Sequence, residues 1–155
     1  MFFVGITAFL TTSDGMRIDN PKNLKKSEKK LALLQKRLSM KQKGSKNRDK
    51  ARIKVATTQE HIANQRMDFH NKLSDAMLNA YDTVIMEDLN VSGMIKNHNL
   101  AKSIADAGWS SFMTTLKAKA GSRGKNIIGI GRFDPSSRMC SDCGYIYNLK
   151  LKERT

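Results

Sequence analysis

Glu87 is the residue whose position most suggests metal chemistry, because it directly follows the apolar segment 83–86. A short apolar run of this kind is typical of a strand buried on both faces. Two-metal nucleases hold Mg²⁺ with hard oxygen ligands that converge from the ends of such strands. A solvated or capping carboxylate is the plainer interpretation of one acid, and strand alternation aims Asp88 away from Glu87. Glu87 is therefore our candidate catalytic residue and Mg²⁺ ligand.

Cys140 and Cys143 form the other motif with a chemical meaning. Two thiolates on a tight turn supply half of a tetrahedral Zn²⁺ site. No Cys or His occurs in residues 144–155, and we interpret the chain's three histidines as surface or core residues. A disulfide or a thioredoxin-like redox role fits less well, since no secretory signal precedes the pair and the motif does not follow an early strand. We expect a zinc half site that retains the metal weakly or not at all.

Residues 22–54 contain fourteen Lys or Arg and only two acids, and so carry +12 of the chain's formal charge of +14. A surface of this kind binds nucleic acid by displacing counterions, with strong salt dependence and little sequence preference. A solvated charged helix remains the simpler alternative. An anionic membrane surface is less favoured, because few aromatic or bulky apolar side chains accompany the charge. The side chains that we expect to contact phosphates are Lys43, Lys46, Arg48, Lys50 and Arg52.

The first half of the chain predicts a strand and then a long helical hairpin. Residues 2–12 favour one buried strand, and the turn 13–15 leads to a short second strand over 16–19. Asn20 and Pro21 indicate a helix start, and leucines at helical spacing continue to Met40. A break at 43–47 precedes a longer helix that ends at about Ala80 and folds back on the first. The hairpin over 21–80 thus carries the basic cluster.

The second half predicts an α/β arrangement within one domain. The buried strand 83–86 is followed by a loop over 90–99 and by a helix over 100–120 that is interrupted near Gly108. A second buried strand is expected over 127–130, and the chain then becomes loop-like. We expect no membrane association, since the apolar start of the chain is too short to span a bilayer and has no cleavage pattern.

Three stretches together resemble the TnpB/OrfB proteins of insertion sequences, which are relatives of compact type V CRISPR nucleases. The first runs from Gly44 through Arg66. The second begins with Val84-Ile85-Met86-Glu87-Asp88-Leu89-Asn90-Val91 and continues through Trp109. The third runs from Arg132-Phe133-Asp134-Pro135 into the Cys140 and Cys143 motif. The resemblance covers nearly all of the 155 residues in the same order.

This resemblance implies a RuvC-type, RNase H-like sheet flanked by helices over residues 1–133 and part of a zinc ribbon over 134–155. It also implies Mg²⁺-dependent cleavage of DNA that is guided by an RNA. The family uses an Asp on the first strand, a Glu after the later buried strand and a last Asp beyond the ribbon. Glu87 matches the Glu, Phe3 stands at the first Asp, and the last Asp has no counterpart.

Our hypothesis is therefore a nucleic-acid-binding form of this nuclease, truncated at both ends and not cleaving alone. Its partners would be DNA and a guide RNA, and its place the cytoplasm of a prokaryote that carries the mobile element. One alternative is a non-enzymatic, basic regulator that binds DNA or RNA. Another is a split-gene subunit, in which a second polypeptide supplies the missing acids and cysteines.

Overall fold

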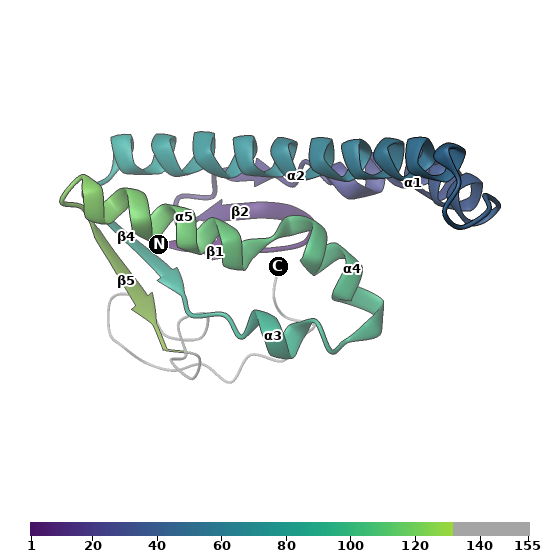
Figure 1. Cartoon of the computed structure of the whole chain (residues 1–155). Coiled ribbons are helices and arrows are strands. Elements are labelled where there is room, and N and C mark those ends of the chain that lie inside the picture. Colours follow the sequence, from purple (N-terminus) through teal and green to yellow (C-terminus); the bar gives the residue numbers. More distant parts are fainter. Residues whose placement is uncertain (132–155) are drawn as a thin grey trace.

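A mixed sheet with the strand order β3-β2-β1-β4-β5 forms the base of the structure, a computed structural model that describes residues 1–131 (Figure 1). Strand β4 runs parallel to β1 and β5, whereas β1, β2 and β3 pair in antiparallel fashion. The strands are β1 (Phe2–Val4), β2 (Ala8–Thr12), β3 (Arg17–Asp19), β4 (Thr83–Glu87) and β5 (Asn126–Ile130). The expected α/β class is confirmed.

The prediction of a single strand over 2–12 was wrong. Strands β1 and β2 pair with each other, with Phe2 opposite Thr12. The bend between them is closed by the amide of Gly5, which donates to the carbonyl oxygen of Phe9 at 3.2 Å. A Cβ atom on Gly5 would lie 3.1 Å from the carbonyl oxygen of Ala8, so the chain can turn closely here because this residue is glycine. The turn at 13–15 joins β2 to β3, as the sequence predicts.

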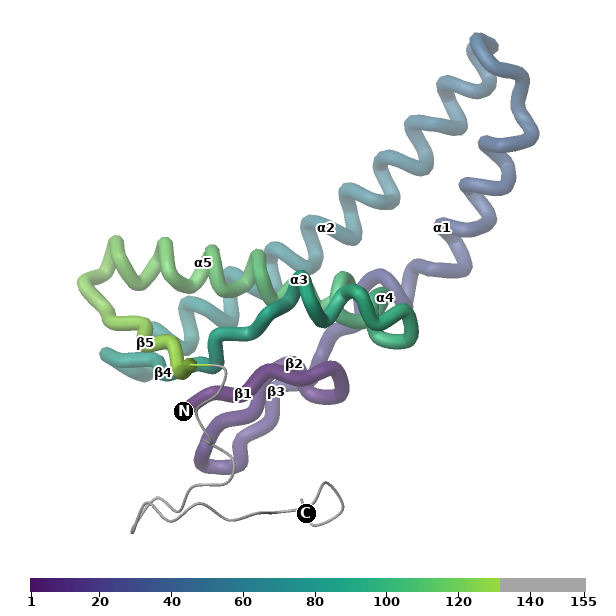
Figure 2. Tube along the Cα trace, turned by 90° about the horizontal axis from the view of Figure 1, so that it is seen from below, coloured from purple at the N-terminus to yellow at the C-terminus, as the bar shows by residue number. Residues whose placement is uncertain are grey.

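Two long helices, α1 (Asn23–Ser39) and α2 (Lys46–Ala80), form the predicted helical hairpin. Figure 2 shows that the loop between them lies at the far end of the molecule, well away from the sheet. Ser45 is the N-cap of α2, and its side chain accepts a hydrogen bond from the amide of Arg48. The break expected at 43–47 therefore marks the true start of α2.

Helix α1 begins later than predicted. The expected cap, Asn20, accepts instead from the amide of Lys22, and the helix starts at Asn23. The carboxylate of Asp106 accepts from the first-turn amides of Leu24 at 2.9 Å and of the next residue at 3.3 Å. A buried acid from a distant helix thus satisfies donors that a local N-cap would otherwise bind. Sequence spacing near the helix start holds no sign of this partner.

The remaining helices follow β4 and precede β5. They are α3 (Val91–Met94), which lies inside the expected loop, α4 (His98–Ala107) and α5 (Trp109–Ser122). Gly108 separates α4 from α5 with a φ of 66°. At this glycine a Cβ would come within 2.9 Å of the Arg66 side chain, so both the backbone angle and the packing favour glycine. The predicted interruption is confirmed.

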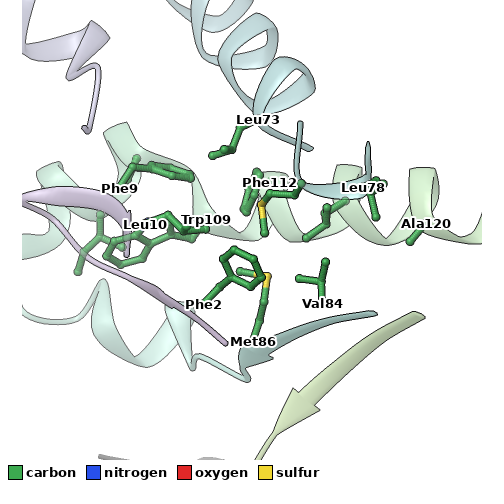
Figure 3. Packing of buried hydrophobic residues seen from close by; sticks show 14 residues of the cluster. Phe2, Phe9, Leu10, Leu73, Leu78, Val84, Met86, Trp109, Phe112 and Ala120 are labelled. Carbon is green, nitrogen blue, oxygen red and sulfur yellow. The ribbon is translucent and has the colours of Figure 1, made fainter. Parts of the chain in front are cut away.

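The hydrophobic core lies on one face of the sheet, and Figure 3 shows Val84 and Met86 of β4 directed toward Trp109 and Phe112 of α5. The helices that build this core, α2, α4 and α5, contribute to a single cluster. Two expectations were therefore wrong. Within residues 1–131, residues 83–86 pack against core-forming helices on one face only. In the same part of the chain, β5 is an edge strand with one neighbour and is not buried, since Ile128 is 50% exposed. None of the described helices is long and apolar enough to cross a membrane.

Candidate functional site

Glu87 is the last residue of β4, which lies between β1 and β5 in the sheet. Its backbone is opposite Ile130 in the parallel strand β5. Since Val84 and Met86 point into the core, alternation places Ile85 and Glu87 on the other face of the sheet. The side chain of Glu87 is half-buried there, at the carboxyl end of an interior strand. This is the position in which the sequence predicts a metal-binding carboxylate.

Phe3 is the residue of β1 that lies next to Glu87 on the neighbouring strand. The parallel pair Phe2 and Met86 fixes the register of the two strands, so the next residues, Phe3 and Glu87, share the face opposite the core. Strands in a sheet lie about 4.8 Å apart. The structure therefore brings an aromatic ring, rather than a second carboxylate, to the position beside Glu87.

Asp88 directly follows β4, and alternation along the strand directs its side chain away from that of Glu87. Its amide donates to the carbonyl oxygen of Ile130 at 3.0 Å, which extends the pairing of β4 with β5. Glu87 and Asp88 are among the residues that line a cavity of about 110 Å³ at the end of β4, together with Trp109 and Lys117 of α5. Trp109 is buried in the core, as its sequence position favours.

Residues 1–131 contain no cluster of three or more His, Cys, Asp or Glu that could hold a metal ion. Glu87 alone does not fit a Mg²⁺ centre, which needs several negative oxygens to offset dehydration of the ion. Three other residues named from the sequence lie outside the described residues, namely Asp134, Cys140 and Cys143. The metal centre is therefore not assembled by the described residues alone.

The five predicted phosphate-contacting residues lie together at the tip of the α1–α2 hairpin. Four of them are exposed: Lys43, Lys46, Lys50 and Arg52. Arg48 is half-buried, and its guanidinium donates to the carbonyl oxygens of Leu38 at 3.1 Å and Lys41 at 3.0 Å. These carbonyls belong to the end of α1 and the loop after it, where helices lack intrahelical donors. Arg48 thus holds the two helices together, a role that the sequence did not reveal.

His70 is a buried core residue at the junction of α2 with α4 and α5. Its Nε2 lies 3.0 Å from the carbonyl oxygen of Ala107, and its Nδ1 lies 3.2 Å from Oγ of Ser111. Burial lowers the pKa of His70 below its ordinary value, the hydrogen bond to Ala107 acts in the opposite direction, and the charge of Arg66 lowers it further. A neutral ring can donate to Ala107 and accept from Ser111 at the same time. This places His70 in the core, as the sequence indicates, and not at a metal site.

Comparison with known proteins decides the family. Residues 4–98, more than half of the chain, match OrfB_IS605, a family described as “Probable transposase”. The chain belongs to the OrfB_IS605 family. The matched residues include the whole helical hairpin and Glu87 at the end of β4, and the match begins at Val4, directly after Phe3.

Curated relatives of this OrfB_IS605 member include a candidate RNA-guided DNA endonuclease of Streptomyces pristinaespiralis. The two are 41% identical over 92% of the chain and 35% of the relative. A protein of Escherichia coli strain K12, the candidate RNA-guided DNA endonuclease InsQ, is 31% identical over 91% of the chain and 39% of the relative. The chain thus spans little more than a third of the length of the curated relatives that it matches.

A solved structure shows the same fold. The chain aligns with Cas12f1 in a complex with sgRNA and target DNA, with a TM-score of 0.54 and 18% identity. The alignment covers 95% of the OrfB_IS605 chain and 39% of Cas12f1. The five-stranded sheet with its flanking helices is therefore a fold that this chain shares with Cas12f1.

Proposed function

We propose that this OrfB_IS605 member binds nucleic acid through its basic helical hairpin, as part of the machinery of an RNA-guided DNA endonuclease. The observation that carries the proposal is the position of the charge. Residues 22–54 hold +12 of the chain's charge of +14. They make up α1, the loop after it and the start of α2, and this loop lies at the end of the hairpin farthest from the sheet (Figure 2). A protruding rod of this charge attracts the phosphate backbone of DNA or RNA.

The endonuclease part of the proposal concerns Glu87. Its place at the end of an interior strand agrees with the Glu of the metal centre that the family resemblance implies. The names of the two curated relatives give the reaction class, and DNA with a guide RNA is the partner set that we propose for this chain. Because Phe3 lies beside Glu87 and residues 1–131 contain no metal cluster, these residues alone should bind nucleic acid without cleaving it.

A salt titration tests the binding. Fluorescence anisotropy of a labelled DNA duplex of about 30 base pairs would be measured from about 50 to 300 mM NaCl, and each phosphate contact should add about 0.9 to the log-log slope. We expect a slope of about 4 or more, similar for two unrelated DNA sequences, and matching behaviour with an RNA duplex. Absence of binding at low salt, or binding that salt does not weaken, would refute the proposed function.

A further inference from the structure

A groove of about 330 Å³ lies between α1 and α2 near the tip of the hairpin. Two half-buried apolar residues, Leu34 and Ala51, form part of its lining. Its other lining residues include four exposed cations: Arg37 from α1, Lys41 from the loop after it, and Lys50 and Lys54 from α2.

Helical spacing explains why these side chains meet. Residues 34 and 37 lie on one face of α1, residue 41 follows two positions after the end of that helix, and residues 47, 50, 51 and 54 lie on one face of α2. Because the two helices fold back on each other (Figure 2), both sets of residues line the same groove. Of the cations at the hairpin tip expected from the sequence, only Lys50 lines this groove. Sequence analysis missed the other three because the pairing of the two faces depends on how the loop closes.

The groove gathers four positive charges in one place. Within residues 1–131, no acidic residue lines it and none of the four cations takes part in an ion pair. Like charges that share a groove with an apolar lining repel each other more than they would in open water. Binding of an anion there would remove this repulsion. The chemistry therefore favours a ligand with concentrated negative charge.

We propose that this groove binds phosphate groups of a nucleic-acid backbone. The inference rests on the proposed function and assigns the contact to a defined surface. Arg37 can donate two hydrogen bonds to one phosphate, and the lysines add mobile point charges. Asn47 also lines the groove and supplies an uncharged donor. Phosphate contacts of this kind fix the position of a protein on the nucleic-acid backbone without recognising the base sequence.

Arg48 contributes indirectly. Its guanidinium joins the start of α2 to the carbonyl oxygens of Leu38 and Lys41, at the closed end of the hairpin. This contact sets how α2 lies against the end of α1, and Lys41 itself lines the groove. Arg48 is therefore a positioning residue for the groove.

Two variants with the same loss of charge test the proposal. The groove variant carries R37Q, K41Q, K50Q and K54Q. The control variant carries R17Q, K29Q, K30Q and K36Q, which also removes one Arg and three Lys, all of them exposed and outside the groove lining. Circular dichroism would first establish that both keep their helix content. If the groove variant does not, the double variant R37Q/K50Q replaces it.

The readout is the salt dependence of binding to a DNA duplex and to an RNA duplex of the same sequence. Loss of two phosphate contacts should lower the log-log slope by about 1.8 and weaken binding about 60-fold near 0.1 M salt, whereas the control should lose less than about 0.9 in slope. A response with one duplex alone identifies that duplex as the source of the phosphate. Equal losses in the groove and control variants would overturn the groove proposal while leaving hairpin binding intact.

Thermal melting in the presence of inorganic phosphate gives a second test of the groove that does not depend on nucleic acid. At equal ionic strength, phosphate in place of chloride should raise the melting temperature of the wild type and of the control variant more than that of the groove variant, because the general stabilisation by phosphate is common to all three. If the wild type fails to bind nucleic acid but shows this difference, the proposed function is wrong and the groove remains an anion site. Equal shifts in melting temperature for all three proteins would overturn the groove proposal.

Discussion

Phe3 and Glu87 lie side by side on the parallel strands β1 and β4, on the face of the sheet opposite the hydrophobic core. The resemblance to the TnpB/OrfB proteins implies an Asp at the position of Phe3. The structure shows that this residue would indeed face the same side as Glu87. A single substitution should therefore bring two carboxylates within reach of one metal ion.

Phe3→Asp should create measurable binding of Mn²⁺ or Mg²⁺. Two carboxylates on adjacent strands, about 4.8 Å apart at the backbone, can share one hard cation. Isothermal titration calorimetry with Mn²⁺ would measure the effect, and we expect at least about a tenfold gain in affinity over the wild type, equal to about 1.4 kcal/mol. Adding Glu87→Gln should abolish the gain.

Thr11→Asp is the matched control for this substitution. Thr11 is opposite Phe3 in the antiparallel pair of β1 and β2, so it shares the same face but lies two strands from Glu87. Its carboxylate starts about twice as far away and should not cooperate with Glu87. Equal Mn²⁺ binding by both single variants would show that any added acid suffices and that Phe3 holds no special position.

Arg48→Gln should loosen the tip of the hairpin. The substitution removes the guanidinium that donates to the carbonyl oxygens of Leu38 and Lys41, and we expect a loss of about 1 kcal/mol in the stability of the paired helix ends. Hydrogen exchange of amides in residues 36–52 would report faster opening. Arg52→Gln removes the same charge from an exposed position and should leave exchange unchanged. Equal acceleration in both variants would assign the effect to net charge.

Acid should weaken the fold through His70. Burial keeps the folded-state pKa of His70 below 6.5, so the unfolded chain binds the proton first as pH falls. Stability is therefore complete above pH 6.5 and declines below it, by at most about 2 kcal/mol at pH 5. Urea unfolding between pH 7.5 and 5 would measure the slope.

His70→Gln provides the comparison. This variant should be less stable at pH 7.5, because a buried hydrogen-bond pair is disturbed, but it should lose less stability on acidification. Lys119 lowers the pKa of Asp75, and Lys125 lowers that of Asp82. Stability from these carboxylates is lost only as pH falls below about 4, outside the range measured. If stability falls with pH equally steeply in the wild type and in His70→Gln, His70 is not the source of the acid sensitivity.

Local patterns in the sequence predict part of this architecture. The apolar run before Glu87, the leucine spacing of α1 and the glycine at 108 each act through neighbours in the chain, and each predicts its element correctly. The bend at Gly5 was missed, because β-forming residues on both sides of a glycine resemble one continuous strand. Residue type alone does not show where such a segment turns back on itself.

The site depends more on contacts between distant residues. Phe3 lies beside Glu87 only because β1 pairs with β4, although the whole helical hairpin separates these two strands in the sequence. Likewise, Asp106 caps the start of α1 although it lies more than 80 positions later in the chain. Charge density predicts a nucleic-acid surface at the hairpin tip, but the groove at Arg37 forms only when the two helix faces pair. Side chains such as Arg48 look like surface charges in the sequence but bind backbone in the structure.

The most direct test of the account measures binding and cleavage by the purified chain in one experiment. Supercoiled plasmid DNA would be incubated with the wild type and with Glu87→Ala, with and without Mg²⁺ or Mn²⁺, and analysed for both retardation and nicking. Because the described residues supply Glu87 beside Phe3 and no metal cluster, we predict salt-sensitive retardation by both proteins and no nicking by the wild type above the Glu87→Ala control. Metal-dependent nicking by the wild type that disappears in Glu87→Ala would contradict this and show that further ligands complete the site.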